Sequence, residues 1–294
     1  MTAVDVSRKT NGVVLPTEVS DEIWGKTLKE SAIMAASRQI TLPGPGVTVQ
    51  TITGDVTAKW VDETEEKPVD RPTFGAKKMT PYTLAVIVPF SNQFRRDTPA
   101  LYGELVRRLP YALATEFDKT VMGETAKPGD NFDTLADAEV MKVGDKTTYK
   151  DLVAIYSKIA GNDAKVSAWL AAPEFQAKLM AATDTAGRPL FVPDTLGTGE
   201  IGRFLGRPIM DAPRVTDCIG VAGDFASAAS YGIVEGVSID ISTESSLKDT
   251  DGKTLNLWQR NMFAVRAEIE IGFRIRDIKS FVRIQDGATT PASR

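Results

Sequence analysis

The stretch Asp97–Glu124, DTPALYGELVRRLPYALATEFDKTVMGE, decides the fold, because its pattern predicts one long amphipathic helix. Thr98 can cap this helix, and Pro99 suits the first helical position, where no N–H is needed. A continuous helix of this length would extend roughly 40 Å, longer than most globular domains need. We therefore expect a spine helix on which the other elements pack. Its apolar face repeats every four residues through Leu101, Leu105, Leu109, Leu113, Phe117 and Val121.

Pro110 lies inside this predicted spine helix. A proline in a helix interior removes one backbone hydrogen bond and crowds the preceding turn. We therefore expect either a kink near Val106 or a division into two helices.

The composition restricts the class of protein. The chain has 294 residues, 42% hydrophobic and 25% charged, which is enough for one large domain or two ordinary ones. A net charge of −4 argues against a protein that grips nucleic acid tightly, because phosphate binding needs a concentrated basic surface. No apolar run approaches the roughly 20 residues that span a bilayer, and the N-terminus lacks the apolar core of a signal peptide. We expect a soluble protein with no membrane partner that is not exported by that route.

The missing residue types restrict the chemistry. The chain has no histidine, which removes Ser–His–Asp and Cys–His catalysis and every histidine metal site. Its single cysteine, Cys218, allows no disulfide within the chain, and a reducing compartment is compatible with that. An enzyme would have to rely on carboxylates, lysines, serines and tyrosines, and we expect no cofactor and no metal.

The segments before the spine predict an arm, a helix and a long hairpin. Met1–Pro16 lacks apolar periodicity and is expected to form an extended arm or a frayed terminus. Glu18–Ser37 has a helical pattern, which the LPGPG run at Leu42–Gly46 ends. From Val47 to Phe90, the strand-like runs VTVQTI, VTAKWV and TPYTLAVIVPF flank a charged stretch, which predicts a hairpin with a polar tip. A two-stranded ribbon is only marginally stable in water, so we expect it to lie on a neighbouring subunit or to fold back on its own domain.

The segments after the spine predict an inserted unit and two closing strands. Short strands alternate with helical patterns between Asp145 and Leu257, which indicates a mixed α/β unit. From Met262 to Arg276 apolar and polar residues alternate strictly, as in a half-buried strand, and a shorter strand follows through Ile284. We expect both strands to pack on the spine helix, which makes the α/β unit an insertion.

One glycine run matches a known motif. GTGEIG, at Gly197–Gly202, fits the G-x-G-x-x-G of dinucleotide-binding turns. That motif must follow a strand and open a helix, whereas Pro193 interrupts the strand and Pro208 stops the helix. We therefore interpret this run as a loop before a strand.

Charged and aromatic residues cluster near the hairpin tip and before the spine. The tip carboxylates could bind a metal, but a solvated or intersubunit charge surface is the preferred interpretation. Trp60 is more typical of an anchor or core residue than of a ligand platform. The predicted intersubunit contacts are Trp60, Asp62, Glu63, Glu65, Glu66, Lys67, Arg71, Arg95 and Arg96.

The order of these parts resembles the major capsid proteins of tailed bacteriophages, which have the Hong Kong 97-type capsid fold. The resemblance covers essentially the whole chain, from arm and helix through a hairpin ending at Ile87–Ser91, the spine helix and the inserted unit to the closing strands. The order and spacing of three local matches make it fairly specific. These are Leu205–Ile209 followed by Ala212–Pro213, Gly223–Phe225 before Tyr231–Gly232, and Asn261 followed by Val265–Glu268.

This resemblance implies an α+β fold with four regions. They are an N-terminal arm and helix (1–46), an extended β-hairpin loop (47–90), a peripheral domain (91–144 and 258–294) and an axial domain (145–257). It implies a structural protein, not an enzyme, that assembles into hexamers, pentamers and a closed icosahedral shell around double-stranded DNA without binding it tightly. The implied location is the virion capsid, after assembly in the bacterial host cytoplasm. Scaffold, portal and decoration proteins are further partners that it leaves open, because no long scaffold-like segment precedes the arm.

Some members of this family cross-link their subunits through a hairpin lysine and an asparagine, assisted by a glutamate in an apolar setting. Asn261 and Glu268 fall on the motif positions with the last two roles, and Lys59 and Lys67 are the candidate lysines. Family members that do not cross-link have similar residues at these positions. We therefore expect Glu268 to form a structural ion pair with Arg266 or Arg274.

Two alternatives stay open. An encapsulin-like compartment subunit of the same fold would predict a cargo-binding groove and no long N-terminal arm. A carboxylate-dependent enzyme in the inserted unit would need convergent Asp or Glu residues in a pocket, and no pairing in the sequence demands one.

Overall fold

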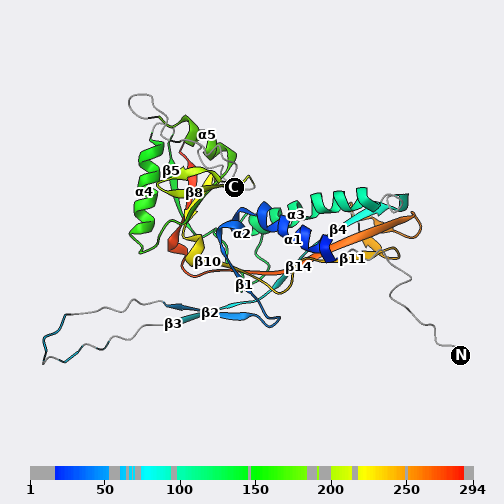
Figure 1. Cartoon of the computed structure of the whole chain (residues 1–294), viewed down its shortest axis with the longest axis horizontal. Helices are drawn as coiled ribbons and strands as arrows, with labels where there is room; N and C mark the ends of the chain where they lie inside the picture. The colour runs from blue at the N-terminus through cyan, green and yellow to red at the C-terminus, as the bar shows by residue number, and fades with distance from the viewer. Residues whose placement is uncertain are drawn as a thin grey trace.

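A long helix and a long strand lie side by side at the centre of the computed structural model, with a thin ribbon extending to one side (Figure 1). The structure describes residues 17–52, 60–63, 66–67, 69, 74–93, 98–144, 147–183, 191, 200–213, 218–248 and 251–287. The predicted arm at Met1–Pro16 lies outside these residues.

The predicted spine helix is α3, Thr98–Met122. Pro110 lies within it and the helix is continuous, so the expected division into two helices is wrong. The fourfold apolar repeat explains the continuity, because that face is buried along the helix and tertiary packing outweighs one lost backbone bond. The buried residues are Leu105, Leu109, Leu113, Phe117 and Val121.

The helix predicted at Glu18–Ser37 is two helices, α1 (Thr17–Glu30) and α2 (Ala32–Ala36). Ser31 separates them in an extended conformation, and its Oγ accepts a hydrogen bond from the Met34 N–H as an N-cap. The same hydroxyl donates to Asp118 Oδ1 of α3 at 2.5 Å, and the Ala32 N–H donates to Asp118 Oδ2 at 3.2 Å. The break is thus fixed by a buried carboxylate of the spine helix, which a local reading of the sequence does not show.

Below the spine helix lies a five-stranded sheet built around β14, Met262–Ile275. The predicted alternation is confirmed for the inner face, since Phe263 and every second residue to Ile275 are buried, but Ala264, Gly272 and Arg274 of the opposite face are buried as well. β4 pairs with one edge of β14, while β11 and β10 pair with the other edge and β1 joins β10 in parallel. These strands are β1 (Arg38–Thr41), β4 (Tyr82–Ser91), β10 (Ala229–Ile233) and β11 (Ser238–Ser242).

A six-stranded mixed sheet with two helices forms the second part of the fold, as the α/β pattern predicted. Its strand order is β5-β15-β9-β6-β8-β7, and α4 (Thr148–Ala160) and α5 (Pro173–Ala181) bury apolar residues against it around Trp169. The strands are β5 (Glu139–Val143), β6 (Ala168–Ala171), β7 (Glu200–Phe204), β8 (Arg207–Asp211), β9 (Gly220–Gly223) and β15 (Phe281–Asp286).

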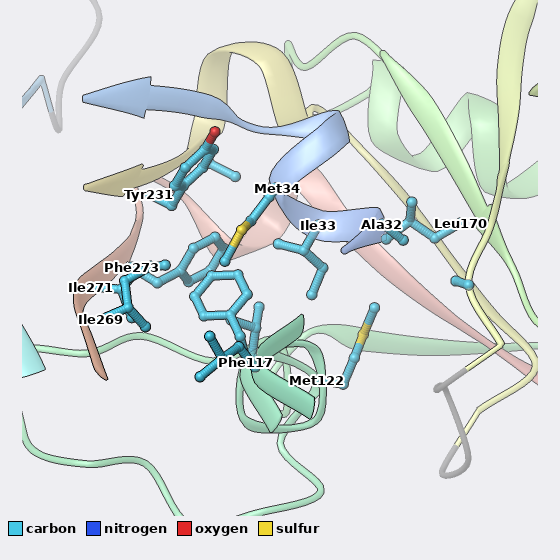
Figure 2. Close-up of a cluster of buried hydrophobic side chains, with 14 of the residues drawn as sticks. Ala32, Ile33, Met34, Phe117, Met122, Leu170, Tyr231, Ile269, Ile271 and Phe273 are labelled. Carbon is cyan, nitrogen blue, oxygen red and sulfur yellow. The ribbon is translucent and has the colours of Figure 1, made fainter. Parts of the chain in front are cut away.

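The two sheets share one hydrophobic core (Figure 2). Side chains of α2, α3 and β14 converge there, and Leu170 reaches it from β6 of the six-stranded sheet. Phe117 and Phe273 lie edge to face with ring centroids 6.0 Å apart, a geometry that adds to the stabilisation from apolar burial. The short helix α6 (Phe225–Ala228) and the 3₁₀ turn η2 (Ile278–Ser280) connect the sheets.

Two predicted pairings are wrong. TPYTLAVIVPF is not the second arm of the hairpin: it is β4, which pairs with β14, and the partner of β2 (Val47–Ile52) is β3 (Phe74–Met79). The second closing strand, β15, does not return to the spine helix but pairs with β5 and β9. Apolar runs identified these strands correctly but carry no information on partners. The small hairpin of β12 (Ser246–Lys248) and β13 (Thr254–Asn256) precedes β14.

No described helix is both long and apolar enough to cross a membrane.

We predict that Asp118→Ala destabilises the folded subunit by about 2–3 kcal/mol, because it leaves the Ser31 hydroxyl and the Ala32 N–H without their charged acceptor. The measurement is urea denaturation of unassembled subunits, with exposed Glu116→Ala on the same helix as the control. Equal denaturation midpoints for Asp118→Ala and the control would contradict this role.

Candidate assembly surfaces

The β2–β3 ribbon forms a two-stranded sheet of its own that projects from the body of the protein (Figure 1). Its strands pair antiparallel from Val47 opposite Met79 to Ile52 opposite Phe74. Two strands alone bury too little apolar surface to be stable in water. Its root is attached to the body, since Met79 is buried and Lys77 bonds to Ile275, but no third described strand pairs with the ribbon.

The root of the ribbon is fixed by a buried arginine. Arg274, whose side chain is 9% exposed, donates to Asp133 Oδ1 at 2.7 Å and to the Lys78 carbonyl at 2.8 and 2.6 Å. It also donates to Asn131 Oδ1 at 2.9 Å, and Lys77 Nζ donates to the Ile275 carbonyl at 2.8 Å. These bonds connect β3 with β14 and with the loop after the spine helix. They hold the direction in which the ribbon leaves the body.

The ribbon residues predicted to make intersubunit contacts are solvent-exposed wherever the structure describes them. The Trp60 side chain is fully exposed, and Asp62, Glu63, Glu66 and Lys67 are exposed near it. Full exposure of Trp60 excludes the core alternative within the described part of the chain. The residues Lys59, Glu65, Arg71, Arg95 and Arg96 lie outside the described residues. No group of three or more metal-binding side chains occurs among those that are described.

Asn261 and Glu268, two of the proposed cross-linking residues, lie far apart along one chain. Asn261 lies in the turn before β14 with a φ of 52°, and Glu268 lies about 23 Å further along that strand. The Arg266 Nε is 3.2 Å from Glu268 Oε1, and its Nη2 is 2.8 Å from Asp240 Oδ2. The hydrogen bond with Asp240 and the nearby Glu268 raise the pKa of Arg266. Glu268 thus has the structural ion pair with Arg266 that we expected, while Arg274 pairs with Asp133.

An exposed tryptophan that the sequence analysis missed lies near Asn261. Trp258 is 72% exposed, and its carbonyl accepts the Asn261 N–H at 3.3 Å in the turn that leads into β14. Its only signal in the sequence is a tryptophan within a polar run between two strands. It marks the far end of β14 as a second exposed surface.

The chemistry of the described cavities is sparse. A depression of about 450 Å³ is lined by Glu235, Glu268 and Glu270, but Glu268 is already paired with Arg266. A smaller apolar cavity of about 180 Å³ lies between Tyr82, Phe117 and Phe132. Burial raises the pKa of the Cys218 thiol despite its bond to Arg283, so it is a poor nucleophile.

The glycine run also departs from a dinucleotide site. Glu200 begins strand β7, whereas the fingerprint needs a helix at this point. Gly197 and Gly199 lie outside the described residues.

Comparison with known proteins gives one consistent set of relatives. The family model described as "Phage capsid family" matches residues 11–286. The probable major capsid protein gp17 of Mycobacterium phage D29 is 27% identical, covering 92% of this chain and 89% of the relative. The major capsid protein of Klebsiella oxytoca phage phiKO2 is 25% identical, covering 92% of this chain and 68% of the relative.

Solved structures agree on the fold. A chain from Gordonia phage Cozz matches with a TM-score of 0.70 at 20% identity, covering 88% of this chain and 87% of that one. A chain described as the capsid of an empty GTA particle matches with a TM-score of 0.66 at 12% identity, covering 98% of this chain and 96% of that one. At such identities the likeness concerns the fold alone.

We predict that Arg274→Ala destabilises the subunit by about 3 kcal/mol and loosens the ribbon, because the half-buried Asp133 carboxylate and the Lys78 carbonyl both lose their arginine donor. Urea denaturation and amide hydrogen exchange of β3 are the measurements. Arg266→Ala is the matched control, since it removes an exposed ion pair from the same face of β14. Equal effects of the two substitutions would remove the structural role of Arg274.

Proposed function

The chain belongs to the phage capsid family, and we propose that it builds an icosahedral shell in which each subunit supports the ribbon of a neighbour. One observation carries the proposal: the ribbon leaves the body as two strands without a third, inside a fold that matches the family over residues 11–286. A closed shell supplies a neighbour for every ribbon, so no subunit keeps an unsupported one.

The fold class and the function predicted from the sequence are both confirmed. The protein has the α+β phage major capsid fold, and its function is that of a structural, shell-forming capsid protein of the virion. Many moderate interfaces made cooperative by closed symmetry then provide the stability of the shell.

The regions have separate roles in this proposal. The six-stranded sheet with α4 and α5 forms the axial domain that meets its copies in pentamers and hexamers. The spine helix and the β14 sheet form the peripheral domain, and β15 connects the two by pairing within the axial sheet. The ribbon is the extended loop that lies on an adjacent subunit, with Trp60 and the charged tip at the contact.

The contents and surroundings of the shell belong to the same proposal. A net charge of −4 suits a wall around packed double-stranded DNA, because such a wall must enclose the DNA without gripping it. Assembly takes place in the host cytoplasm, with scaffold, portal and decoration proteins as further partners. The protein acts without catalysis of its own, since Glu268 is held by Arg266 and burial raises the pKa of the Cys218 thiol.

The encapsulin alternative is not favoured. The curated relatives are named as phage major capsid proteins, and the matched family is that of phage capsids. A carboxylate-dependent enzyme is likewise without a supporting observation.

We predict that the purified protein forms closed shells or capsomers in negative-stain microscopy, and that replacing residues 53–73 by a short glycine linker abolishes shells. This deletion spares Lys77 and Lys78, so the root held by Arg274 stays intact and the subunit folds. Circular dichroism and the urea midpoint check folding. Normal shells from the deletion variant would refute the role of the ribbon tip, and small discrete oligomers from the unaltered protein would refute the function.

We predict that boiled shells run in denaturing electrophoresis as one band at the 31.8 kDa subunit mass. Cross-linking needs a glutamate in an apolar setting, whereas Glu268 is held by Arg266 on an exposed strand face. A ladder of higher bands that disappears in Asn261→Ala, but persists in the neighbouring Gln259→Ala, would establish the bond and overturn this prediction.

A further inference from the structure

β4 is an edge strand with an unusual composition. Among the described strands it pairs with β14 alone, and its ten residues, YTLAVIVPFS, include no charged side chain. Soluble proteins protect long edges with lysines, prolines or bulges, because unpaired backbone groups recruit other strands. Only Pro89 has that effect here. The edge is therefore suited to receive a further strand.

The register shows which backbone groups of β4 face outward. The Asn92 N–H donates to the Asn261 carbonyl at 2.9 Å, in continuation of the β4–β14 register, so even-numbered residues of β4 bond to β14. Thr83, Ala85 and Ile87 consequently direct their N–H and C=O groups away from β14. No backbone hydrogen bond joins these groups to another described residue. Pro89, at the next outward position, has no N–H and ends the continuous row of donors.

The same alternation gives the outer edge of the ribbon. Arg274 donates to the Lys78 carbonyl, so this carbonyl points out of the ribbon on the β3 side. Lys78 is opposite Thr48, which places the backbone groups of Thr48, Gln50 and Ile52 on the outer edge of β2. β2, VTVQTI, also lacks charged residues.

We propose that β2 of one copy adds to the outer edge of β4 of the next copy, which makes the ribbon and the five-stranded sheet one sheet across the subunit boundary. The proposal rests on the proposed function, which supplies the second copy. Three outward residues on β2 match three on the proline-free part of β4, and neither edge carries a charge that opposes pairing. Strand addition supplies main-chain hydrogen bonds to both edges and a third strand to the ribbon.

The ribbon of the same chain does not pair with the outer edge of β4. β3 and β4 are joined by Thr80 and Pro81 alone, and the ribbon runs from the body in the direction away from β4 (Figure 1). On the β3 side, the root is already bonded to Arg274, which leaves β2 as the free side of the ribbon. A second copy is thus the occupant that the geometry favours.

Cysteine cross-linking during co-assembly tests the pairing. Gln50 and Ala85 are the central outward residues of the two edges, so they lie directly opposite each other when the strands are antiparallel and within one residue of each other when the strands are parallel. In a Cys218→Ser background, subunits with Gln50→Cys are co-assembled with subunits carrying Ala85→Cys and then oxidised. We expect a disulfide-linked dimer in non-reducing electrophoresis, because directly paired residues have a Cα separation that a disulfide can bridge.

Matched controls distinguish β2 from other segments that could pair with the outer edge of β4. Thr51→Cys in place of Gln50→Cys should give at least tenfold less dimer, because its backbone pairs within the ribbon. A dimer from Ala85→Cys subunits alone would assign the edge to a second β4. A dimer of Ala85→Cys with Val14→Cys would assign it to the N-terminal segment. Either of these results, or no dimer from Gln50→Cys with Ala85→Cys, would overturn the proposal.

Proline substitution gives a second test. Ala85→Pro removes an outward N–H and keeps the bonds of β4 to β14, so the subunit should fold with an unchanged urea midpoint and lose shell yield at least tenfold. Leu84→Pro, which removes an inward bond opposite Ile269, should lower the midpoint itself. Normal shells from Ala85→Pro would overturn the strand addition and leave the capsid function intact, whereas absent shells from the unaltered protein would overturn both.

Discussion

The packing of α3 on the buried face of β14 is the constraint on which the rest of the structure depends. Both elements are long and both have a strict apolar period, fourfold in the helix and twofold in the strand, so their buried faces can match along most of their length. Phe117 and Phe273 meet at this contact, and side chains from α2 and β6 complete the same core. One face of strand β14 therefore packs in the interior, and the other face carries polar and charged side chains.

That second face of β14 carries two arginines with different environments. Arg266 lies in solvent between Asp240 and Glu268, where ion pairs contribute little to stability. Arg274 is buried and satisfies Asp133, Asn131 and the Lys78 carbonyl together. The two arginines lie on the same face of one strand, but Arg266 is at the surface whereas Arg274 orients the ribbon. The bonds of Arg274 thus fix the direction of the ribbon relative to the core, although most of the ribbon is not buried in that core.

The sequence could predict the elements that depend on their own periodicity. α3 and β14 follow from patterns that extend over many residues, and the mixed α/β unit follows from alternating short patterns. The errors concern long-range partners. The break at Ser31 depends on Asp118, 87 positions away, and β4 and β15 were recognised as strands but given the wrong neighbours. In the sequence, Arg274 is one more charged residue in an alternating strand, and only the fold shows that it pairs with Asp133.

The assembly surfaces show the same division. The charged tip was expected to be a solvated or intersubunit surface, and Trp60 an anchor or a core residue, whereas Trp258 and the edge of β4 required the fold. An uncharged strand is ordinary when it is central and needs an explanation only when it is an edge. In the proposed assembly, the ribbon and the β4 edge are two halves of one contact that a single subunit leaves open.

Amide hydrogen exchange compared between unassembled subunits and closed shells tests this account most directly. Free subunits should exchange the β2 amides within seconds while β14 stays protected, and assembled shells should protect β2 and the outward amides of Thr83, Ala85 and Ile87 at least a hundredfold more. Equal protection of β2 in free and assembled protein would mean that the ribbon is stable by itself, and the central claim would then be wrong.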